Sequence, residues 1–291
     1  MDAQIWCEGL VRIFKADDVE VFALQGLDLT VERGAMVAVI GVSGSGKSTL
    51  LNILSGLDVP SAGSARVAGY DLLTMSARAR RHYHRRVAGF VWQRAAHNLL
   101  PYLSAVENVE LPMELAGRRR GERRTRALEL LDLAGIGAVA DRRPDRLSGS
   151  EKQRCAVAVA LANEPEVLFA DEPTGELDPE NAADVFTTLR TVNAELGVTV
   201  LIVTHDDHVA GQVDRTVAIR DGRTSSEVRR SVELAADGLH RTVAREYAVL
   251  DRAGRMQLPA AFVRALSLRE RVQLELQPDH VEIRPGQDDA R

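Results

Sequence analysis

The chain has 291 residues, of which 45% are hydrophobic and 27% charged, and its formal net charge is −5. This length suits one large domain and a small one, the balance is typical of a globular protein, and the negative charge gives no general reason to expect a nucleic-acid partner. No apolar run approaches the roughly 20 residues that cross a bilayer, and the N-terminus lacks the basic start and apolar core of a signal peptide. The two cysteines, Cys7 and Cys155, have no metal-binding spacing, so we expect buried, reduced thiols.

The N-terminal part of the chain shows strand patterns on both sides of a glycine-rich loop. Apolar and polar residues alternate over residues 5–14 and 20–31, which predicts two antiparallel strands. The short apolar run Met36–Ile40 leads into the loop and predicts a buried parallel strand. A helix is expected over residues 47–55, and residues 87–92 predict a further strand.

The pattern changes to leucine-rich helical periods over about residues 93–162, which predicts a helical subdomain inserted into the sheet domain. Residues 167–170, 199–203 and 216–219 return to strand patterns, and a helix is expected over 181–196. Strand, helix and strand at this spacing imply parallel pairing. Residues 1–225 are therefore expected to form one α/β domain.

The C-terminal part of the chain has a pattern of its own. We expect a linker over residues 226–240 and a small β-rich unit over 241–286. Within this unit the sequence predicts strands at 247–250 and just before Pro259, a helix at 260–266, and a hairpin that turns at Pro278 and Asp279.

The glycine-rich loop reads GVSGSGKST and matches the pattern of a phosphate-binding loop, Gly-x-x-x-x-Gly-Lys-Ser. Glycines let the backbone wrap a phosphate with its N–H groups, and the following helix offers its positive end to the anion. We expect Lys47 to reach the β- and γ-phosphates of a nucleoside triphosphate and Ser48 to bind Mg²⁺. The residues expected to contact the nucleotide here are Gly41, Val42, Ser43, Gly44, Ser45, Gly46, Lys47, Ser48 and Thr49.

A second motif, LFADEP, ends a buried strand with two acids. Asp171 would then lie at the carboxyl end of the sheet, where ligands bind in open α/β folds, and would hold Mg²⁺ through water. Glu172 is placed to polarise the attacking water, and a carboxylate suits this role because phosphoryl transfer depends on positioning and electrostatics.

Two further motifs complete a set, LSGSEKQR at residues 147–154 and TVLIVTH ending at His205. Together the four motifs resemble the nucleotide-binding subunit of an ATP-binding cassette (ABC) transporter over about residues 4–225. The resemblance implies a P-loop NTPase fold with a parallel sheet core, an antiparallel β-subdomain and a helical subdomain. It also implies an ATPase that closes over ATP and Mg²⁺ as a head-to-tail dimer of two copies.

The resemblance carries several roles onto single residues. In the family, the signature serine and glycine of one subunit bind the γ-phosphate held by the other, which implies this role for Ser148 and Gly149. Gln93 resembles the glutamine that senses Mg²⁺ and faces the membrane partner, His205 resembles the histidine that contacts the γ-phosphate, and Asp178 lies at the D-loop position. The catalytic residues are thus expected to be Glu172, His205, Gln93 and Lys47, and the Mg²⁺ ligands Ser48, Gln93 and Asp171.

Three positions need separate mention. Phe14 lies where the family stacks an aromatic ring on adenine, and the alternative is an ordinary residue of a β-sheet core. Ser150 replaces the usual second signature glycine, and a positive φ there would cost of order 1 kcal/mol. Glu176 is unusual in the D-loop and adds a charge near the expected dimer interface.

Within the family, stretches such as GVSGSGKSTLLNILSGLD and ADEPTGELD resemble the macrolide-exporter and lipoprotein-releasing branch. This implies an integral-membrane permease as partner, driven for export, lipoprotein release or mechanotransmission, and a peripheral location on the cytoplasmic side of the plasma membrane. The apolar loop 99–103 suits contact with the permease, unless it packs on its own subdomain. The arginine-rich run 118–126 is interpreted as a solvated helix start, with contact to anionic lipid head groups as the alternative.

Residues 250–285 resemble the swapped-hairpin fold of AbrB/SpoVT-type regulators, on the stretch LDRAGRMQLPAAFVRAL. In that family two chains interleave, which implies a dimerisation role here. The family module often binds DNA through arginines near the positions of Arg252 and Arg255. Residues 241–291 hold nine arginines against eight acids, which is weak for phosphate binding, so no nucleic-acid partner is expected. An ATP-dependent regulator that binds DNA through this module is the alternative function.

Overall fold

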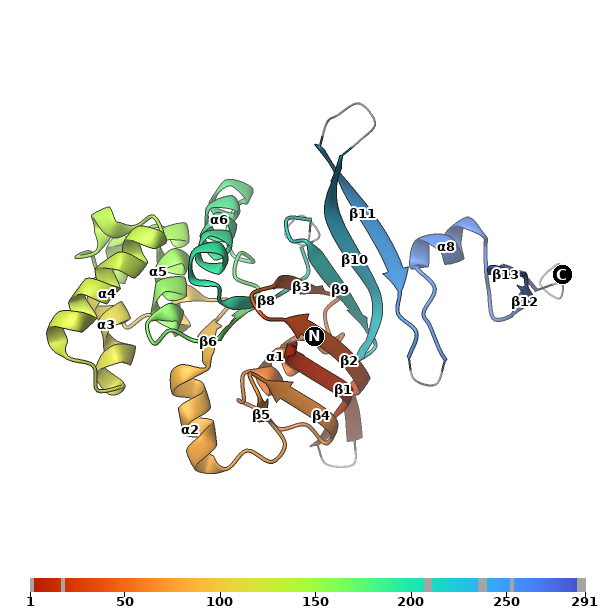
Figure 1. The fold of residues 1–291 in the computed structure, drawn as a ribbon, viewed down its shortest axis with the longest axis horizontal. Helices are drawn as coiled ribbons and strands as arrows, with labels where there is room; N and C mark the ends of the chain where they lie inside the picture. The colour runs from red at the N-terminus through yellow and green to blue at the C-terminus, as the bar shows by residue number, and fades with distance from the viewer. Residues whose placement is uncertain (1–2, 17–18, 207–210, 235–239, 252–253, 287–291) are drawn as a thin grey trace.

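The computed structural model describes residues 3–16, 19–206, 211–234, 240–251 and 254–286. Two sheets, a group of helices and a C-terminal extension make up the chain (Figure 1). No helix in these ranges is long and apolar enough to cross a membrane.

The larger sheet has seven strands in the order β11-β10-β9-β3-β8-β7-β6. Strands β9, β3, β8, β7 and β6 are parallel, as expected from the strand and helix pattern. Because they are parallel, their carboxyl ends meet at one edge, where Ile40 pairs with Thr204 and Asp171 with Val203. These strands span β3 (Met36–Ile40), β6 (Ala88–Val91), β7 (Val167–Asp171), β8 (Thr199–Thr204) and β9 (Arg215–Arg220).

The smaller sheet has the order β2-β1-β4-β5 and is antiparallel throughout. The two long strands expected at the N-terminus are present and pair along their whole length, from Ala3 opposite Glu32 to Ala16 opposite Val19. An apolar core between the two sheets buries α1 (Lys47–Leu54). The strands of this sheet are β1 (Ala3–Ala16), β2 (Val19–Glu32), β4 (Ala62–Val67) and β5 (Tyr70–Asp71).

The helices expected between residues 93 and 162 are present and share a second core with α6. Asn108 fixes the loop at 99–103, because its side-chain amide donates to the carbonyls of Leu100 and Leu103. Leu99 is buried in the core while Tyr102 is 63% exposed, so the loop packs partly on its own subdomain. The elements here are η1 (Ala95–His97), α3 (Ala105–Leu115), α4 (Arg120–Leu133), η2 (Gly137–Val139), η3 (Pro144–Arg146), α5 (Gly149–Leu161) and α6 (Pro179–Leu196).

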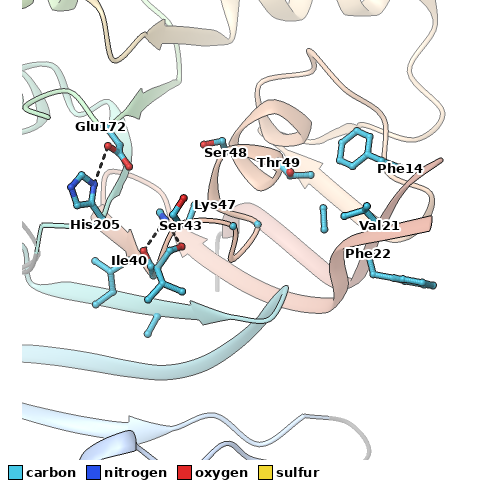
Figure 2. A pocket seen from close by; sticks show the side chains of 16 residues that line it. Phe14, Val21, Phe22, Ile40, Ser43, Lys47, Ser48, Thr49, Glu172 and His205 are labelled. Carbon is cyan, nitrogen blue, oxygen red and sulfur yellow. Dashed lines mark hydrogen bonds and ion pairs between the residues drawn. The ribbon is translucent and has the colours of Figure 1, made fainter. Parts of the chain in front are cut away.

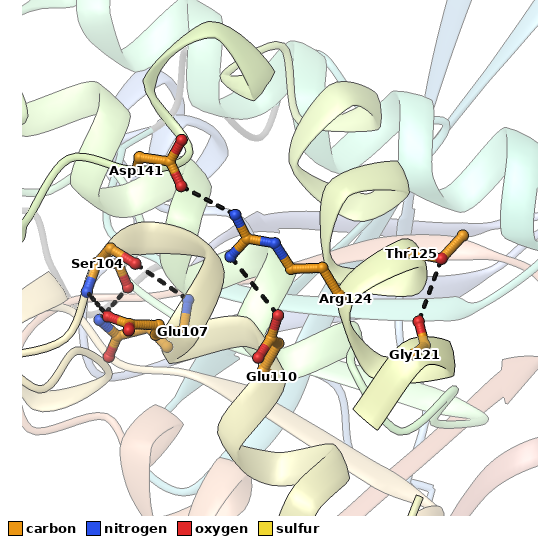
Figure 3. A network of polar contacts seen from close by, with 8 residues as sticks. Ser104, Glu107, Glu110, Gly121, Arg124, Thr125 and Asp141 are labelled. Carbon is orange, nitrogen blue, oxygen red and sulfur yellow. Dashed lines mark hydrogen bonds and ion pairs between the residues drawn. The ribbon is translucent and has the colours of Figure 1, made fainter. Parts of the chain in front are cut away.

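The arginine-rich run at the start of α4 is largely neutralised by acids of its own subdomain. Arg124 bridges Glu110 and Asp141, at 3.7 and 3.0 Å (Figure 3). Arg118 and Arg123 lie 3.0 and 3.1 Å from Glu164 and Glu114 respectively. These contacts favour the interpretation of the run as an ordinary solvated helix face.

The expected linker at 226–240 is wrong in its described part, which is mostly strand. β10 (Arg223–Leu234) pairs with β9 on one side and with β11 (His240–Ala248) on the other, so its backbone groups are satisfied within the sheet. Glu227 anchors the pairing, since its carboxylate lies 2.9 Å from Arg215 and also contacts Arg229.

The last part of the chain is a small unit joined to this sheet. Of the strand expected at 247–250, only Tyr247 and Ala248 are strand, as the end of the longer β11. No strand precedes Pro259 among the residues described there. The expected helix and hairpin are present as α8 (Ala260–Ala265) and as β12 (Val272–Leu276) paired with β13 (Val281–Pro285). At the hairpin turn, the N–H of Gln277 donates to the carbonyl of His280 at 2.8 Å.

Candidate active site

A cavity of about 980 Å³ opens at the carboxyl edge of the parallel strands, between the glycine-rich loop and the strands β1 and β2. Phe14 lies at one end of it, Glu172 and His205 lie at the other, and Lys47 lies between (Figure 2). Of the loop residues expected to contact a nucleotide, all except Ser45 line this cavity: Gly41, Val42, Ser43, Gly44, Gly46, Lys47, Ser48 and Thr49.

The loop is held in a shape that only glycine permits at its critical corner. Gly46 has a φ of 100°, and a Cβ there would meet the carbonyl oxygen of Ala23 well inside van der Waals contact. Helix α1 begins at the next residue, so its free N–H groups point towards the loop. Lys47 is 6% exposed, and its ammonium donates to the carbonyls of Gly41 and Val42 at 2.7 and 3.0 Å.

The two acids of the second motif occupy different environments. Asp171 ends β7, and burial, together with the charge of Glu172, raises the pKa of its carboxyl, against the opposing effect of Lys47. Glu172 has a φ of 44°, and its N–H donates to the carbonyl of Val203 at 2.8 Å. A left-handed backbone at a non-glycine residue is strained by about 1–3 kcal/mol, a cost often found at functional sites.

His205 and Glu172 are in direct contact, with 3.0 Å between Nδ1 and Oε2. The side chain of His205 is 61% exposed and that of Glu172 20%, so the pair lies at the mouth of the cavity. The contact orients both groups, because Nδ1 donates to the carboxylate and leaves Nε2 free for another partner.

Gln93 lies beside this pair without lining the cavity. A Cβ built on Gly175 would lie 3.4 Å from Gln93 Nε2 and 3.3 Å from Glu172 Oε2, so both side chains adjoin the same glycine. The next residue, Arg94, forms a 3.0 Å ion pair with Glu176. The ion pair of Arg94 with Glu176 thus connects the segment after β6 with the segment after β7.

The signature residues lie apart from the cavity, at the start of α5. The Ser148 hydroxyl accepts a hydrogen bond from the N–H of Glu151, whose carboxylate in turn accepts one from the N–H of Ser148. Ser150 lies within the helix and has no positive φ, so the strain considered for it does not arise. Neither Ser148 nor Gly149 lines the cavity, and neither does Asp178, which caps α6 by accepting from the N–H of Asn181.

Phe14 is not a core residue, because it is 40% exposed and lines the cavity. The guanidinium of Arg12 lies 4.5 Å from its ring centroid and is itself paired with Asp58 at 2.8 Å. Val21 and Phe22 also line the cavity and were missed by the sequence reasoning. A signal was available, since the alternation of the second strand breaks into consecutive apolar residues there.

Comparison with known proteins identifies related chains. The family described as "ABC transporter" matches residues 24–175, about half of the chain. The macrolide export ATP-binding/permease protein MacB of Burkholderia thailandensis is 47% identical over 214 residues, which are 74% of this chain and 32% of that protein. The lipoprotein-releasing system ATP-binding protein LolD 2 of Caulobacter vibrioides is 44% identical over 221 residues, 76% of this chain and 96% of that protein.

Solved structures of ABC transporter cassettes also match the chain. A dimeric bacterial ABC transporter cassette, MJ0796, has a TM-score of 0.69 and 37% identity, and the match covers 77% of this chain and 97% of that one. The same cassette as a dimer in a post-hydrolysis state with ADP and Pi has the same TM-score, at 36% identity.

The chain spans about a third of the length of the macrolide export relatives it matches. None of these matches supports the alternative of a DNA-binding regulator. The chain therefore belongs to the ABC transporter family and carries an ATP-binding cassette of that family.

Proposed function

We propose that two copies of this chain hydrolyse ATP at composite sites and thereby drive an integral-membrane permease. The observation that carries this proposal is that the candidate residues lie in two separate places, one group in the cavity and the other at the start of α5. The phosphate loop, Glu172 and His205 line the cavity of one chain, while Ser148 and Gly149 lie outside it, exposed to solvent at the start of α5. A head-to-tail second copy would complete each site with its own Ser148 and Gly149.

The nucleotide would lie along the cavity, with its adenine at Phe14 and its phosphates at the glycine-rich loop. Phe14 stacks on the adenine, and the N–H groups of the loop and of the start of α1 surround the phosphates. The ammonium of Lys47 donates to two carbonyls of its own loop. Binding replaces these bonds with charge-assisted bonds to the phosphate oxygens, which are stronger.

The oxygen donors near the phosphate loop fit a magnesium ion. The hydroxyl of Ser48 and the carboxylate of Asp171 are hard oxygen ligands, and the amide of Gln93 adds a third oxygen. The raised pKa of Asp171 reflects a buried carboxylate beside Glu172, and a cation at this position would relieve that repulsion. Magnesium bound with ATP would neutralise charge that develops on the phosphate oxygens.

Hydrolysis requires an attacking water in line with the γ-phosphate. Glu172 accepts a hydrogen bond from this water and positions it, and the strained backbone at Glu172 aims the carboxylate at the cavity. His205 holds that carboxylate through Nδ1 and directs Nε2 towards the γ-phosphate.

The second copy supplies the remaining donors. The Ser148 hydroxyl accepts from the N–H of Glu151 and lies 3.5 Å from the Ser150 hydroxyl, which can act as the donor in that contact. The Ser148 proton can then be donated to the γ-phosphate across the interface. The start of α5 adds the N-terminal end of a helix, which favours an anion. Asp178, in the D-loop, lies at the same interface.

The permease contact is proposed at the loop 99–103, next to Gln93. Tyr102 is exposed there, while Leu99 and the Asn108 hydrogen bonds fix the base of the loop. Similarity to a macrolide export protein and to a lipoprotein-releasing protein supports a permease of that branch and the work of export, lipoprotein release or mechanotransmission. The cassette would then lie on the cytoplasmic side of the plasma membrane.

The C-terminal unit is proposed to hold two cassettes together as an AbrB-like swapped hairpin. Leu274 and Leu276 on β12 are 64% and 82% exposed, and Leu268 is the one buried hydrophobic residue among those described at 254–286. An isolated two-stranded sheet is at best marginally stable in water, so pairing with a second copy would cover these residues. A permanent pair would also lower the entropic cost of each closure. The double variant Leu274→Glu/Leu276→Glu should therefore lower the mass of the nucleotide-free protein in sedimentation.

The test of the proposed function uses Glu172→Gln, which should bind ATP and stall with its sites closed. We would purify it with ATP and Mg²⁺ from detergent-solubilised membranes and identify the proteins that co-purify. The control is Lys47→Ala/Glu172→Gln, which should not hold the nucleotide. A permease that co-purifies with the single variant alone is expected, whereas soluble partners or DNA in its place would contradict the proposal.

A further inference from the structure

Helix α2 (Ala77–Arg86) is the most basic element of the chain. Its sequence, ARARRHYHRR, holds five arginines and two histidines and has no acid. The whole chain has a net charge of −5, so this helix concentrates positive charge against the overall balance. In Figure 1, α2 stands apart from the other helices, next to β6.

One face of α2 is fixed to the body of the protein. Tyr83 is fully buried, and its hydroxyl donates to the carbonyl of Leu54. Arg80 donates to the carbonyl of Gly56 at 2.8 Å. The exposed side of the helix carries residues spaced three and four apart, and together with the half-buried Arg86 they line a shallow depression of about 500 Å³: Arg78, Arg81, His82 and Arg85.

Arg86 interacts electrostatically with Glu164, but Arg78, Arg81 and Arg85 form no ion pair with a carboxylate among the described residues. This sets them apart from the run on α4, where Arg118, Arg123 and Arg124 are each within 4 Å of an acid. Like charges four residues apart, such as Arg81 and Arg85, destabilise a helix. The helix dipole favours basic residues only in the last turn, so it does not explain the arginines of the first turns.

We propose that this face of α2 binds the anionic phospholipid head groups of the membrane that holds the permease. The inference rests on the proposed function, because it takes the cassette to lie beneath a permease. Helix α2 leads through β6 to Gln93, the segment proposed to face that partner. Docking at the loop 99–103 would therefore bring α2 close to the membrane surface.

The size of the patch favours a lipid surface over a nucleic acid. A helix of ten residues is about 15 Å long, whereas DNA binding needs a longer basic track with many phosphate contacts. Anionic lipids diffuse within the leaflet and gather beneath a small basic patch, and each arginine near the surface strengthens binding about five-fold.

The test measures binding of the full chain, without permease, to vesicles of phosphatidylcholine alone or with about one third phosphatidylglycerol. The variant Arg81→Gln/Arg85→Gln should lower the partition coefficient on anionic vesicles by about 30-fold, and added salt should weaken the binding of the unmodified chain. The control Arg119→Gln/Arg120→Gln removes the same charge from exposed arginines at the start of α4, and a loss below about three-fold is expected.

Other outcomes overturn the inference in distinguishable ways. Equal losses in both variants would mean that net charge, not α2, determines binding. Binding of duplex DNA through Arg81 and Arg85 without vesicle binding would identify a nucleic acid as the partner. Loss of the permease in co-purification with unchanged vesicle binding would identify the permease. ATP hydrolysis is measured on the same samples. If the chain hydrolyses ATP but does not bind vesicles, only the lipid contact is refuted. If the chain binds vesicles but does not hydrolyse ATP, the proposed function is refuted.

Discussion

Replacement of Gly46 by alanine tests the shape of the phosphate loop. The backbone φ of 100° disfavours an L-residue by about 1–2 kcal/mol. The new methyl group would also overlap the carbonyl oxygen of Ala23 and lie 2.9 Å from Leu24 Cδ2, both on β2. Forcing β2 away from α1 should cost about 1–3 kcal/mol more, by analogy with overpacked cores. The expected loss is therefore about 2–5 kcal/mol in the free energy of unfolding.

Gly44→Ala is the matched control for Gly46→Ala. Gly44 has a φ of 79° but nothing within 4 Å of an added Cβ, so only the backbone cost of about 1–2 kcal/mol applies. Urea unfolding of both variants without nucleotide gives the comparison, because the shift of the midpoint reports the change in stability. Gly46→Ala should be the less stable of the two by about 1–3 kcal/mol. Equal losses would refute the steric reasoning, since backbone strain alone would then account for both.

Three further predictions concern residues outside the loop. Ser148→Ala should lower the free energy of unfolding by about 1 kcal/mol in the same urea assay. Glu151→Gln still caps the helix and should change this free energy by less than about 0.5 kcal/mol, and the reverse order would be evidence against the capping box. The raised pKa of Asp171 means that the folded chain binds this proton more tightly than the unfolded chain does, so stability is lost as pH rises from 3.8 through the folded-state pKa and changes no further above it. Asp171→Asn should remove this pH-dependent loss and also lose ATP hydrolysis, and a stability difference that does not depend on pH would contradict this cause. The ion pair of Arg94 with Glu176 is exposed, so a double-mutant cycle with glutamine at both positions should give a coupling free energy below about 1 kcal/mol, and added salt should reduce it. A much larger coupling free energy would contradict the weak contact expected for exposed side chains.

Much of the cassette was predictable because its signals are local. The buried strand Met36–Ile40 and the glycine loop after it are contiguous, and the acids of LFADEP follow directly on their strand. Parallel strands then bring these ends to one edge of the sheet, whatever lies between them in sequence. The capping roles of Ser148 and Asp178 were not predicted; the structure shows them, each at the residue before a helix.

The rest depended on contacts between distant segments. β10 is too polar to show a buried face, and its pairing with β9 and β11 is what makes it a strand. The arginines of α4 and α2 look alike in sequence. Only the fold places acids beside Arg124, whereas Arg81 forms no ion pair with any residue that the structure describes. The contact of His205 with Glu172 joins the ends of two strands, which no sequence spacing measures.

The account depends most directly on the claim that each ATP is enclosed by two chains. Retention of ATP after rapid desalting measures this enclosure, even if the C-terminal units keep the chains paired. Glu172→Gln should retain about one ATP per chain in the presence of Mg²⁺. The double variant Ser148→Glu/Glu172→Gln leaves the cavity of each chain unchanged but should retain none, because the added carboxylate would repel the γ-phosphate bound by the other copy. Full retention by the double variant would show that a single chain encloses its own nucleotide, and would contradict the composite site.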